Sequence, residues 1–91
     1  MMLNSDYVSS IISIANFCSR HKILFTLHPL YDGLQIRFPG CYGDMICHSG
    51  SYGHSFGHVE SYAFPWDEGD ATELTIDEAK KKLLDYYSHK E

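Results

Sequence analysis

Residues 23–38 have the sequence Ile-Leu-Phe-Thr-Leu-His-Pro-Leu-Tyr-Asp-Gly-Leu-Gln-Ile-Arg-Phe, and this stretch decides the fold. Its first part, Ile23 to Tyr31, is rich in residues that favour strands. Its second part alternates apolar and polar side chains, as a strand with one buried face does. Asp-Gly between two such runs is a strong signal for a two-residue turn. We therefore expect a hairpin that turns at Asp32-Gly33 and sets Tyr31 opposite Leu34.

This register also sets Pro29 opposite Ile36 and Leu27 opposite Phe38, and it gives the hairpin two unlike faces. Proline cannot donate a hydrogen bond to a neighbouring strand, so the first strand is expected at a sheet edge or to bulge at Pro29. One face is expected to point toward the core and the other to form a polar sheet surface. The first carries Phe25, Leu27, Pro29, Tyr31, Leu34, Ile36 and Phe38, and the second Thr26, His28, Gln35 and Arg37.

An amphipathic helix is expected on each side of the strands. The first runs from about Ser5 to Arg20 with Asn4 or Ser5 as its cap, and Thr75 with Glu78 forms a capping box that starts the second. Each helix has one apolar stripe at helical spacing. The stripes are Val8, Ile11, Ile12, Ala15 and Cys18, and then Ile76, Ala79, Leu83 and Tyr86 or Tyr87, toward a helix end near Ser88.

Two shorter strands are expected between the hairpin and the second helix, at Met45 to His48 and His58 to Phe64. A glycine-rich loop separates them, and an acidic connection follows Pro65 as far as Glu73. No internal repeat or linker interrupts the chain, so we expect a single domain over residues 1–91. The fold class is α+β in the order α-β-β-β-β-α, a small antiparallel sheet with both helices on one face.

The charged residues of the chain favour some classes of binding partner over others. The chain carries seven Lys and Arg against twelve Asp and Glu, a formal charge of -5. This balance disfavours direct binding of nucleic acid and favours a basic protein surface, including one that itself holds nucleic acid. No export signal and no membrane-spanning apolar run is visible. The odd number of cysteines indicates reduced thiols, so we expect a cytoplasmic protein without a membrane partner.

An acidic stretch follows a run of aromatic residues. Interfaces use aromatic anchors for affinity and charges for steering, so this pattern predicts a partner-binding surface. The alternative for Trp66 is a lid over the edge of the core. The expected partner-binding residues are Tyr62, Phe64, Trp66, Asp67, Glu68, Asp70 and Glu73.

The glycine-rich loop permits a second interpretation. Backbone amides freed by Gly50, Gly53 and Gly57 could cradle an anion, while aromatic rings stack on a base and histidines contact phosphate. The chain would then be a sponge for a signalling nucleotide, with a pocket closed by a second copy. Its ligand-binding residues would be Tyr52, His54, Phe56 and His58. Otherwise these glycines only satisfy the backbone of a turn.

A third interpretation is a zinc-stabilised interaction module that uses Cys41, Cys47, His54 and His58. Zinc needs four converging ligands, and the short C-x2-C pairs of structural sites are missing. Neighbours such as Cys47 and His48 would also point to opposite faces of a strand. The other explanation is a small buried cysteine with surface histidines. No catalytic or cofactor-binding motif is present, so neither an enzyme nor a resident cofactor is expected.

Three segments carry a resemblance to known proteins: residues 31–39, residues 43–53 and residues 59–67, the last ahead of a Thr-x-x-Glu-Ala helix. They resemble small uncharacterised proteins encoded by bacteriophages and mobile elements of Gram-positive bacteria. That resemblance implies an anti-defence context, which includes anti-CRISPR proteins, and it implies no catalytic residues. The leading expectation is a phage-type accessory protein of the host bacterial cytoplasm. It would bind and inhibit a bacterial defence protein through its acidic and aromatic surface, without catalysis.

Overall fold

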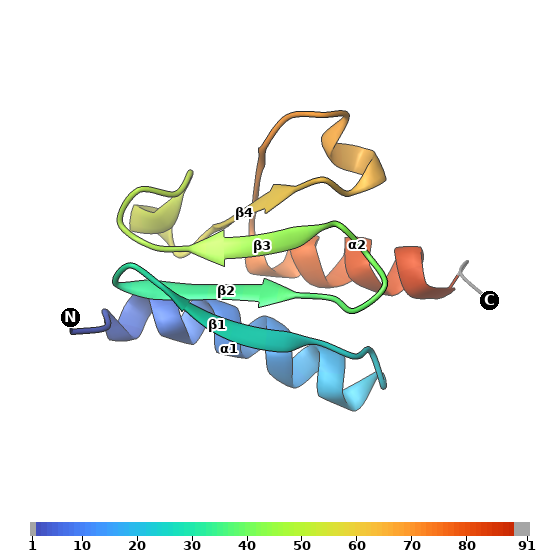
Figure 1. Cartoon of the computed structure of the whole chain (residues 1–91), viewed down its shortest axis with the longest axis horizontal. Helices are drawn as coiled ribbons and strands as arrows, with labels where there is room; N and C mark the ends of the chain where they lie inside the picture. The colour runs from blue at the N-terminus through green and yellow to red at the C-terminus, as the bar shows by residue number, and fades with distance from the viewer. Residues whose placement is uncertain (1, 89–91) are drawn as a thin grey trace.

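A computed structural model describes residues 2–88 as a helix, a five-stranded sheet and a second helix (Figure 1). Two short 3-10 helices, η1 (His54–Phe56) and η2 (Pro65–Asp67), interrupt the second half. The predicted α+β class and its helix–strands–helix order are confirmed. The elements are α1 (Ser5–Arg20), β1 (Thr26–Leu30), β2 (Gly33–Arg37), β3 (Asp44–Cys47), β4 (Val59–Tyr62), β5 (Thr72–Leu74) and α2 (Ile76–Ser88).

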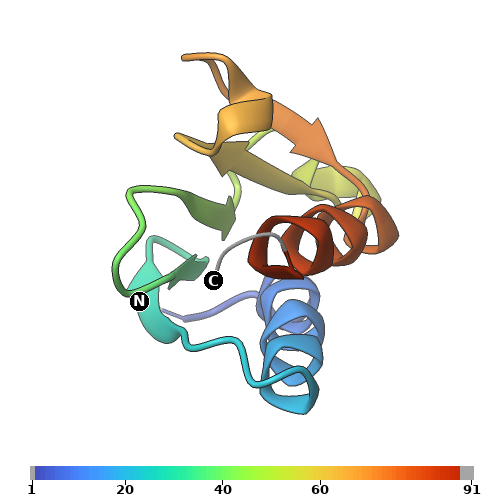
Figure 2. The ribbon, with the colours of Figure 1, turned by 90° about the vertical axis from the view of Figure 1, so that its right-hand side faces the viewer.

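The sheet is an antiparallel meander in which each strand lies beside its neighbours in the chain, in the order β1-β2-β3-β4-β5. α1 packs on β2 and β3, α2 packs on β4 and β5, and the two helices contact each other. Figure 2 shows both helices on the same side of the curved sheet, as the sequence predicts. No helix within residues 2–88 is long and apolar enough to cross a membrane.

The core lies between the helices and the sheet, where each element contributes its apolar stripe or face. Both predicted helical stripes supply buried residues, and the strands supply alternate positions. The largest fully buried side chains are Phe38, Ile11, Ile14, Ile36, Met45, Leu83, Val59, Cys18 and Cys47, together with the polar Ser61.

The turn between β1 and β2 differs from the predicted one. Leu30 lies opposite Gly33, so the two turn residues are Tyr31-Asp32 rather than Asp32-Gly33. A Cβ atom on Gly33 would overlap the carbonyl oxygen of Cys47, so glycine is required inside the strand. The positive φ of the turn (53°) falls on Tyr31 instead. The predicted pairs Tyr31–Leu34, Pro29–Ile36 and Leu27–Phe38 are therefore wrong.

The slip moves each pair by two residues, so the predicted division of the hairpin into two faces is kept. β1 is an edge strand, as Pro29 predicts. Because α1 packs on β2 and β3 and leaves β1 largely uncovered, Leu27 is 37% exposed and Tyr31 66% exposed. Pro29 is exposed as well, so the expectation that Leu27, Pro29 and Tyr31 point into the core is wrong.

The helix ends follow the predicted caps. Asn4 Oδ1 accepts hydrogen bonds from the N–H groups of Asp6 (2.9 Å) and Tyr7 (3.4 Å). The N–H of Thr75 donates to Glu78 Oε1 (2.8 Å), and the N–H of Glu78 donates to Thr75 Oγ1 (3.1 Å). Both helices therefore begin where side-chain acceptors satisfy the first free N–H groups.

The strands after the hairpin differ in extent from the predicted ones and are followed by an additional strand. β3 begins and ends one residue before the predicted Met45–His48, and β4 covers only the middle of the predicted His58–Phe64. β4 stops because Ala63 has a positive φ (67°) and η2 begins at Pro65. β5 lies in the segment expected to be a connection, where it pairs with β4.

Candidate functional site

The structure divides the predicted acidic and aromatic surface into buried and exposed parts. Phe64 (2% exposed) and Asp67 (3% exposed) lie in the interior, so neither presents its side chain to a partner. Asp67 Oδ2 accepts hydrogen bonds from Ser61 Oγ (2.9 Å) and from the N–H of Phe64 (3.0 Å). The carboxylate is buried because it accepts the hydrogen bond of the Phe64 N–H at the start of η2. The expectation that Asp67 is a surface charge is therefore wrong.

Trp66 covers the edge of the core, the alternative that the sequence leaves open. Its ring stacks on Phe64 with centroids 4.3 Å apart, and its Nε1–H donates to Ser61 Oγ (3.0 Å). The Lys82 ammonium lies 5.6 Å from the ring centroid. The predicted residues that remain exposed are Tyr62, Glu68, Asp70 and Glu73.

The glycine-rich loop uses its backbone N–H groups within the protein. Those of Phe56 and His58 both donate to the Gly53 carbonyl oxygen (3.0 Å each). The N–H of Tyr52 donates to a carboxylate, Glu60 Oε1 (2.9 Å). Two of the amides expected to cradle an anion have partners as well: the N–H of Gly50 donates to His48 Nδ1 (2.9 Å) and that of Gly57 to the His54 carbonyl oxygen (3.2 Å). The Glu60 carboxylate beside the loop would also repel an anion. The proposed phosphate cradle is not formed.

The aromatic and histidine side chains of this loop do not converge on one cavity. Tyr52 and Phe56 are exposed. His54 Nδ1 lies 3.0 Å from the hydroxyl oxygen of Tyr7, whereas His58 Nδ1 lies 2.6 Å from Glu73 Oε2. The predicted nucleotide site therefore separates into a contact with α1 and a contact with β5.

The predicted zinc ligands are also dispersed. Cys47 is in the core, where burial raises the pKa of its thiol, and Cys41 accepts a hydrogen bond from the Tyr86 hydroxyl (3.8 Å). His54 and His58 face the different partners given above. Within residues 2–88, no three His, Cys, Asp or Glu side chains are placed to hold a metal ion. The structure therefore does not bring the four predicted zinc ligands together.

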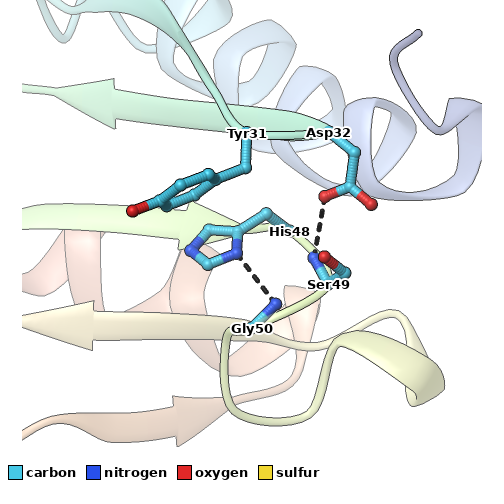
Figure 3. Close-up of a pocket in the computed structure, with 5 residues that line it drawn as sticks. All are labelled: Tyr31, Asp32, His48, Ser49 and Gly50. Atoms are coloured by element: carbon cyan, nitrogen blue, oxygen red, sulfur yellow. Dashed lines mark hydrogen bonds between the residues drawn. The ribbon is translucent and has the colours of Figure 1, made fainter. Parts of the chain in front are cut away.

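A depression that the sequence does not predict lies where the β1–β2 turn faces the segment after β3 (Figure 3). Its volume is about 600 Å³. We call its five lining residues the hairpin end: Tyr31, Asp32, His48, Ser49 and Gly50.

His48 is the fixed polar group of the hairpin end. It is only 9% exposed, and its Nδ1 accepts a hydrogen bond from the N–H of Gly50 (2.9 Å). An acceptor nitrogen carries no proton, so the neutral imidazole carries it on Nε2, which is then a donor. The Tyr31 ring lies against the imidazole with centroids 5.0 Å apart. Ser51 Oγ fixes the backbone of His48 through two hydrogen bonds. It accepts from the His48 N–H (3.0 Å) and donates to the His48 carbonyl oxygen (2.9 Å).

Asp32 ties three chain segments together. Its Oδ1 accepts from the N–H of Ser49 (2.9 Å), and its backbone carbonyl oxygen accepts from the N–H of Asn4 (2.7 Å). The hydrogen bond from Ser49 lowers the pKa of the Asp32 carboxyl below its ordinary value. The hairpin end therefore combines a carboxylate, a fixed N–H donor and an exposed aromatic ring.

The hydrogen bonds of His48 differ from those of a catalytic histidine. A catalytic histidine of the Ser-His-Asp kind donates from Nδ1 to a carboxylate, so that Nε2 can accept a proton. Here Nδ1 accepts from Gly50, and Asp32 bonds to the backbone of Ser49 rather than to the imidazole. Nε2 is thus held as a donor for a carbonyl, carboxylate or other acceptor.

No protein-family model, curated protein or solved structure matches this chain. The resemblance to phage-encoded proteins therefore gains no support from a matched relative and stays a prediction. A fold of this kind carries no activity by itself, so the function depends on the hairpin end and the exposed charges.

Proposed function

We propose that this chain is a non-catalytic binding protein that docks onto a partner through its hairpin end. The observation that best supports this proposal is the geometry of His48, which is nearly buried. Its Nδ1 accepts a hydrogen bond from the Gly50 N–H, and this fixes Nε2–H as a donor. A donor that is already oriented loses little conformational entropy when a partner binds. The exposed Tyr31 ring beside it supplies the kind of aromatic anchor that interfaces use.

The expected partner is a protein with a basic surface. The formal charge of -5 favours such a partner and speaks against direct contact with phosphate groups. An inhibitor of a bacterial defence protein, acting without catalysis in the cytoplasm, is the specific form of this proposal that the phage-type resemblance implies. It is tested by identifying the partner.

The docking surface can be tested by crosslinking at defined positions. A photo-reactive benzoylphenylalanine replaces Ser49 at the hairpin end or, as a control, the exposed Leu24 near the opposite end of β1. In bacterial cells that produce each protein, we expect a discrete protein adduct from position 49 and none of that mass from position 24. Mass spectrometry of the adduct then identifies the partner.

A second variant makes this experiment specific to the depression. His48→Asn keeps an acceptor near Nδ1 for the Gly50 N–H and removes the Nε2–H donor. Introduced together with the crosslinker, it is expected to reduce the adduct several-fold. Equal adducts from positions 49 and 24, or an adduct that His48→Asn leaves unchanged, would show that the hairpin end is not the docking surface.

A second candidate surface is the exposed remainder of the predicted acidic stretch. Glu68 and Asp70 are exposed on the loop after η2. The buried Asp67 holds this loop in place, and its carbonyl oxygen accepts a hydrogen bond from the N–H of Asp70 (2.9 Å). Charges fixed in this way steer a basic partner and raise its association rate. Glu68→Lys should then slow association several-fold at low salt, whereas Asp77→Lys, which makes the same change of charge at the exposed start of α2, should not. Equal effects would indicate net charge alone.

A further inference from the structure

We infer that the hairpin end binds the guanidinium group of an arginine side chain on its protein partner. This inference rests on the proposed function, because it names the chemical group that the docking surface receives. Three observations carry it: a carboxylate, an exposed aromatic ring and a donor for the peptide backbone lie around one depression (Figure 3).

The charge of the depression selects a cation. Asp32 brings a carboxylate to its rim, and the Ser49 N–H that binds Oδ1 keeps it ionised by lowering its pKa. The neutral form of His48 adds a donor and carries no positive charge that would cancel the negative charge of Asp32. An anionic ligand would face Asp32 and the net negative charge of the chain. A cation is attracted by both.

The aromatic ring selects guanidinium over ammonium. Tyr31 is 66% exposed, and its ring leans on the His48 imidazole at an interplanar angle of 56°. Its backbone has a φ of 53°, a conformation that is unfavourable for a tyrosine and that places the side chain at the tip of the turn. Guanidinium is planar and weakly hydrated, so it stacks on a tyrosine and still reaches a carboxylate. An ammonium group keeps its water more strongly.

The His48 donor indicates that the arginine is bound as part of a peptide. Guanidinium has only donors, so the Nε2–H of His48 cannot bind it. That N–H instead suits a main-chain carbonyl oxygen next to the arginine. A peptide-like arginine should therefore bind better than free guanidinium, and the two should differ in their dependence on His48.

The probe is N-acetyl-arginine-N′-methylamide, titrated into the ¹⁵N-labelled protein while the amide signals of Ser49 and Gly50 are followed. For a molecule of this size we expect a Kd on the order of 1 mM at low salt. The citrulline counterpart has nearly the same shape and no charge, and it should bind at least tenfold more weakly. The lysine counterpart should bind several-fold more weakly.

Single substitutions with matched controls test the contribution of the carboxylate, the aromatic ring and the His48 donor. Asp32→Asn keeps an acceptor for the Ser49 N–H and removes the charge, so it should weaken the arginine probe at least fivefold. Tyr31→Leu should weaken it similarly, whereas Tyr52→Leu, at another exposed tyrosine outside the depression, should not. His48→Asn should weaken the arginine probe and leave the binding of guanidinium chloride, used below denaturing concentration, unchanged.

The outcomes separate this inference from the proposed function. Equal binding of the arginine and citrulline probes, or a Tyr31→Leu variant that binds normally, overturns the guanidinium assignment. A crosslink from position 49 without arginine binding overturns that assignment and leaves the docking surface supported. Arginine binding without a crosslink supports the assignment and overturns docking in the cell.

Discussion

Asp67 shows how one buried carboxylate can hold a surface loop. Its Oδ2 accepts from Ser61 Oγ and the Phe64 N–H, and Ser61 Oγ in turn accepts from the Trp66 indole. Replacing Asp67 with alanine leaves two buried donors without this acceptor, and each such loss costs about 1–3 kcal/mol. We expect Asp67→Ala to lower the free energy of unfolding by about 3 kcal/mol, measured by urea denaturation.

Asp67→Asn is the matched control for this prediction. The amide oxygen can still accept both hydrogen bonds, so the expected loss is about 1 kcal/mol. Glu68→Ala, next in the chain and exposed, should change stability by less than about 0.5 kcal/mol. Equal losses for the alanine and asparagine variants would indicate that the two hydrogen bonds to Oδ2 do not hold the loop.

The lowered pKa of Asp32 makes the free energy of unfolding depend on pH. The Ser49 N–H lowers the pKa of its carboxyl in the folded protein below the ordinary value of 3.8. A lowered folded pKa stabilises the protein above pH 3.8, and this contribution is lost as the pH falls through the folded value. The stability difference between wild type and Asp32→Asn should therefore be largest near neutral pH and shrink below pH 3.8. Glu78, whose pKa is also lowered, is present in both proteins and cancels. A difference that is constant from pH 7 to pH 2 would contradict the role of Asp32.

The sequence predicts residue roles where the partners are close in the chain. Asn4, Thr75 and Glu78 cap helices through backbone groups two or three residues away, and each is predicted from its pattern. Asp67 lies in a run of acidic residues that favours a solvated surface. Its acceptor role depends on Ser61, six residues earlier, which the fold alone brings beside it.

Strand register depends on one glycine. A Cβ on Gly33 would overlap the backbone carbonyl of Cys47, so β2 and β3 cannot keep their spacing around a side chain there. We expect Gly33→Ala to lower the free energy of unfolding by about 3 kcal/mol, because backbone must move. Gly40→Ala is the control: it has open space and a φ of 79°, so it should cost only about 1–2 kcal/mol for its backbone conformation. A Gly33→Ala variant no less stable than Gly40→Ala would refute this view of the register.

Helices are easier to predict from a sequence than strands for a physical reason. A helix is defined by local spacing and by caps within a few residues, so the bounds of α1 match the prediction. Strand pairing depends on distant neighbours. The Asp-Gly pair favours a turn at Gly33, but the close approach of β3 requires the glycine inside β2. β5, with three residues, is too short for alternation to reveal it.

At the scale of the molecule, the hairpin end exists because three segments meet at one end of the sheet. Asp32 receives the N–H of Asn4 from the start of the chain and that of Ser49 from the segment after β3. No periodicity or motif relates these positions in the sequence. The sites that the sequence predicts lie in contiguous stretches of chain. In the fold, the residues of these stretches make caps, packing contacts and single polar contacts at separate places.

The two buried thiols can show whether the molecule opens as one unit. Cys18 on α1 and Cys47 on β3 are fully buried in one core, whereas Cys41 is half-buried. Burial raises the pKa of Cys18 to about 11 and also raises that of Cys47, so neither reacts as a thiolate while folded. With N-ethylmaleimide and mass spectrometry, we expect Cys41 to react first. Cys18 and Cys47 should follow together, at rates set by global unfolding.

A Cys41→Ser variant is the control, since it removes the fast reaction and should leave the two slow ones unchanged. If Cys47 reacted more than tenfold faster than Cys18, β3 would have to open without α1, which would contradict a single cooperative unit. Cys47 precedes His48 directly, so such opening would also expose the fixed donor of the hairpin end. Equal rates mean that the depression is as stable as the whole fold, as a site organised before binding requires.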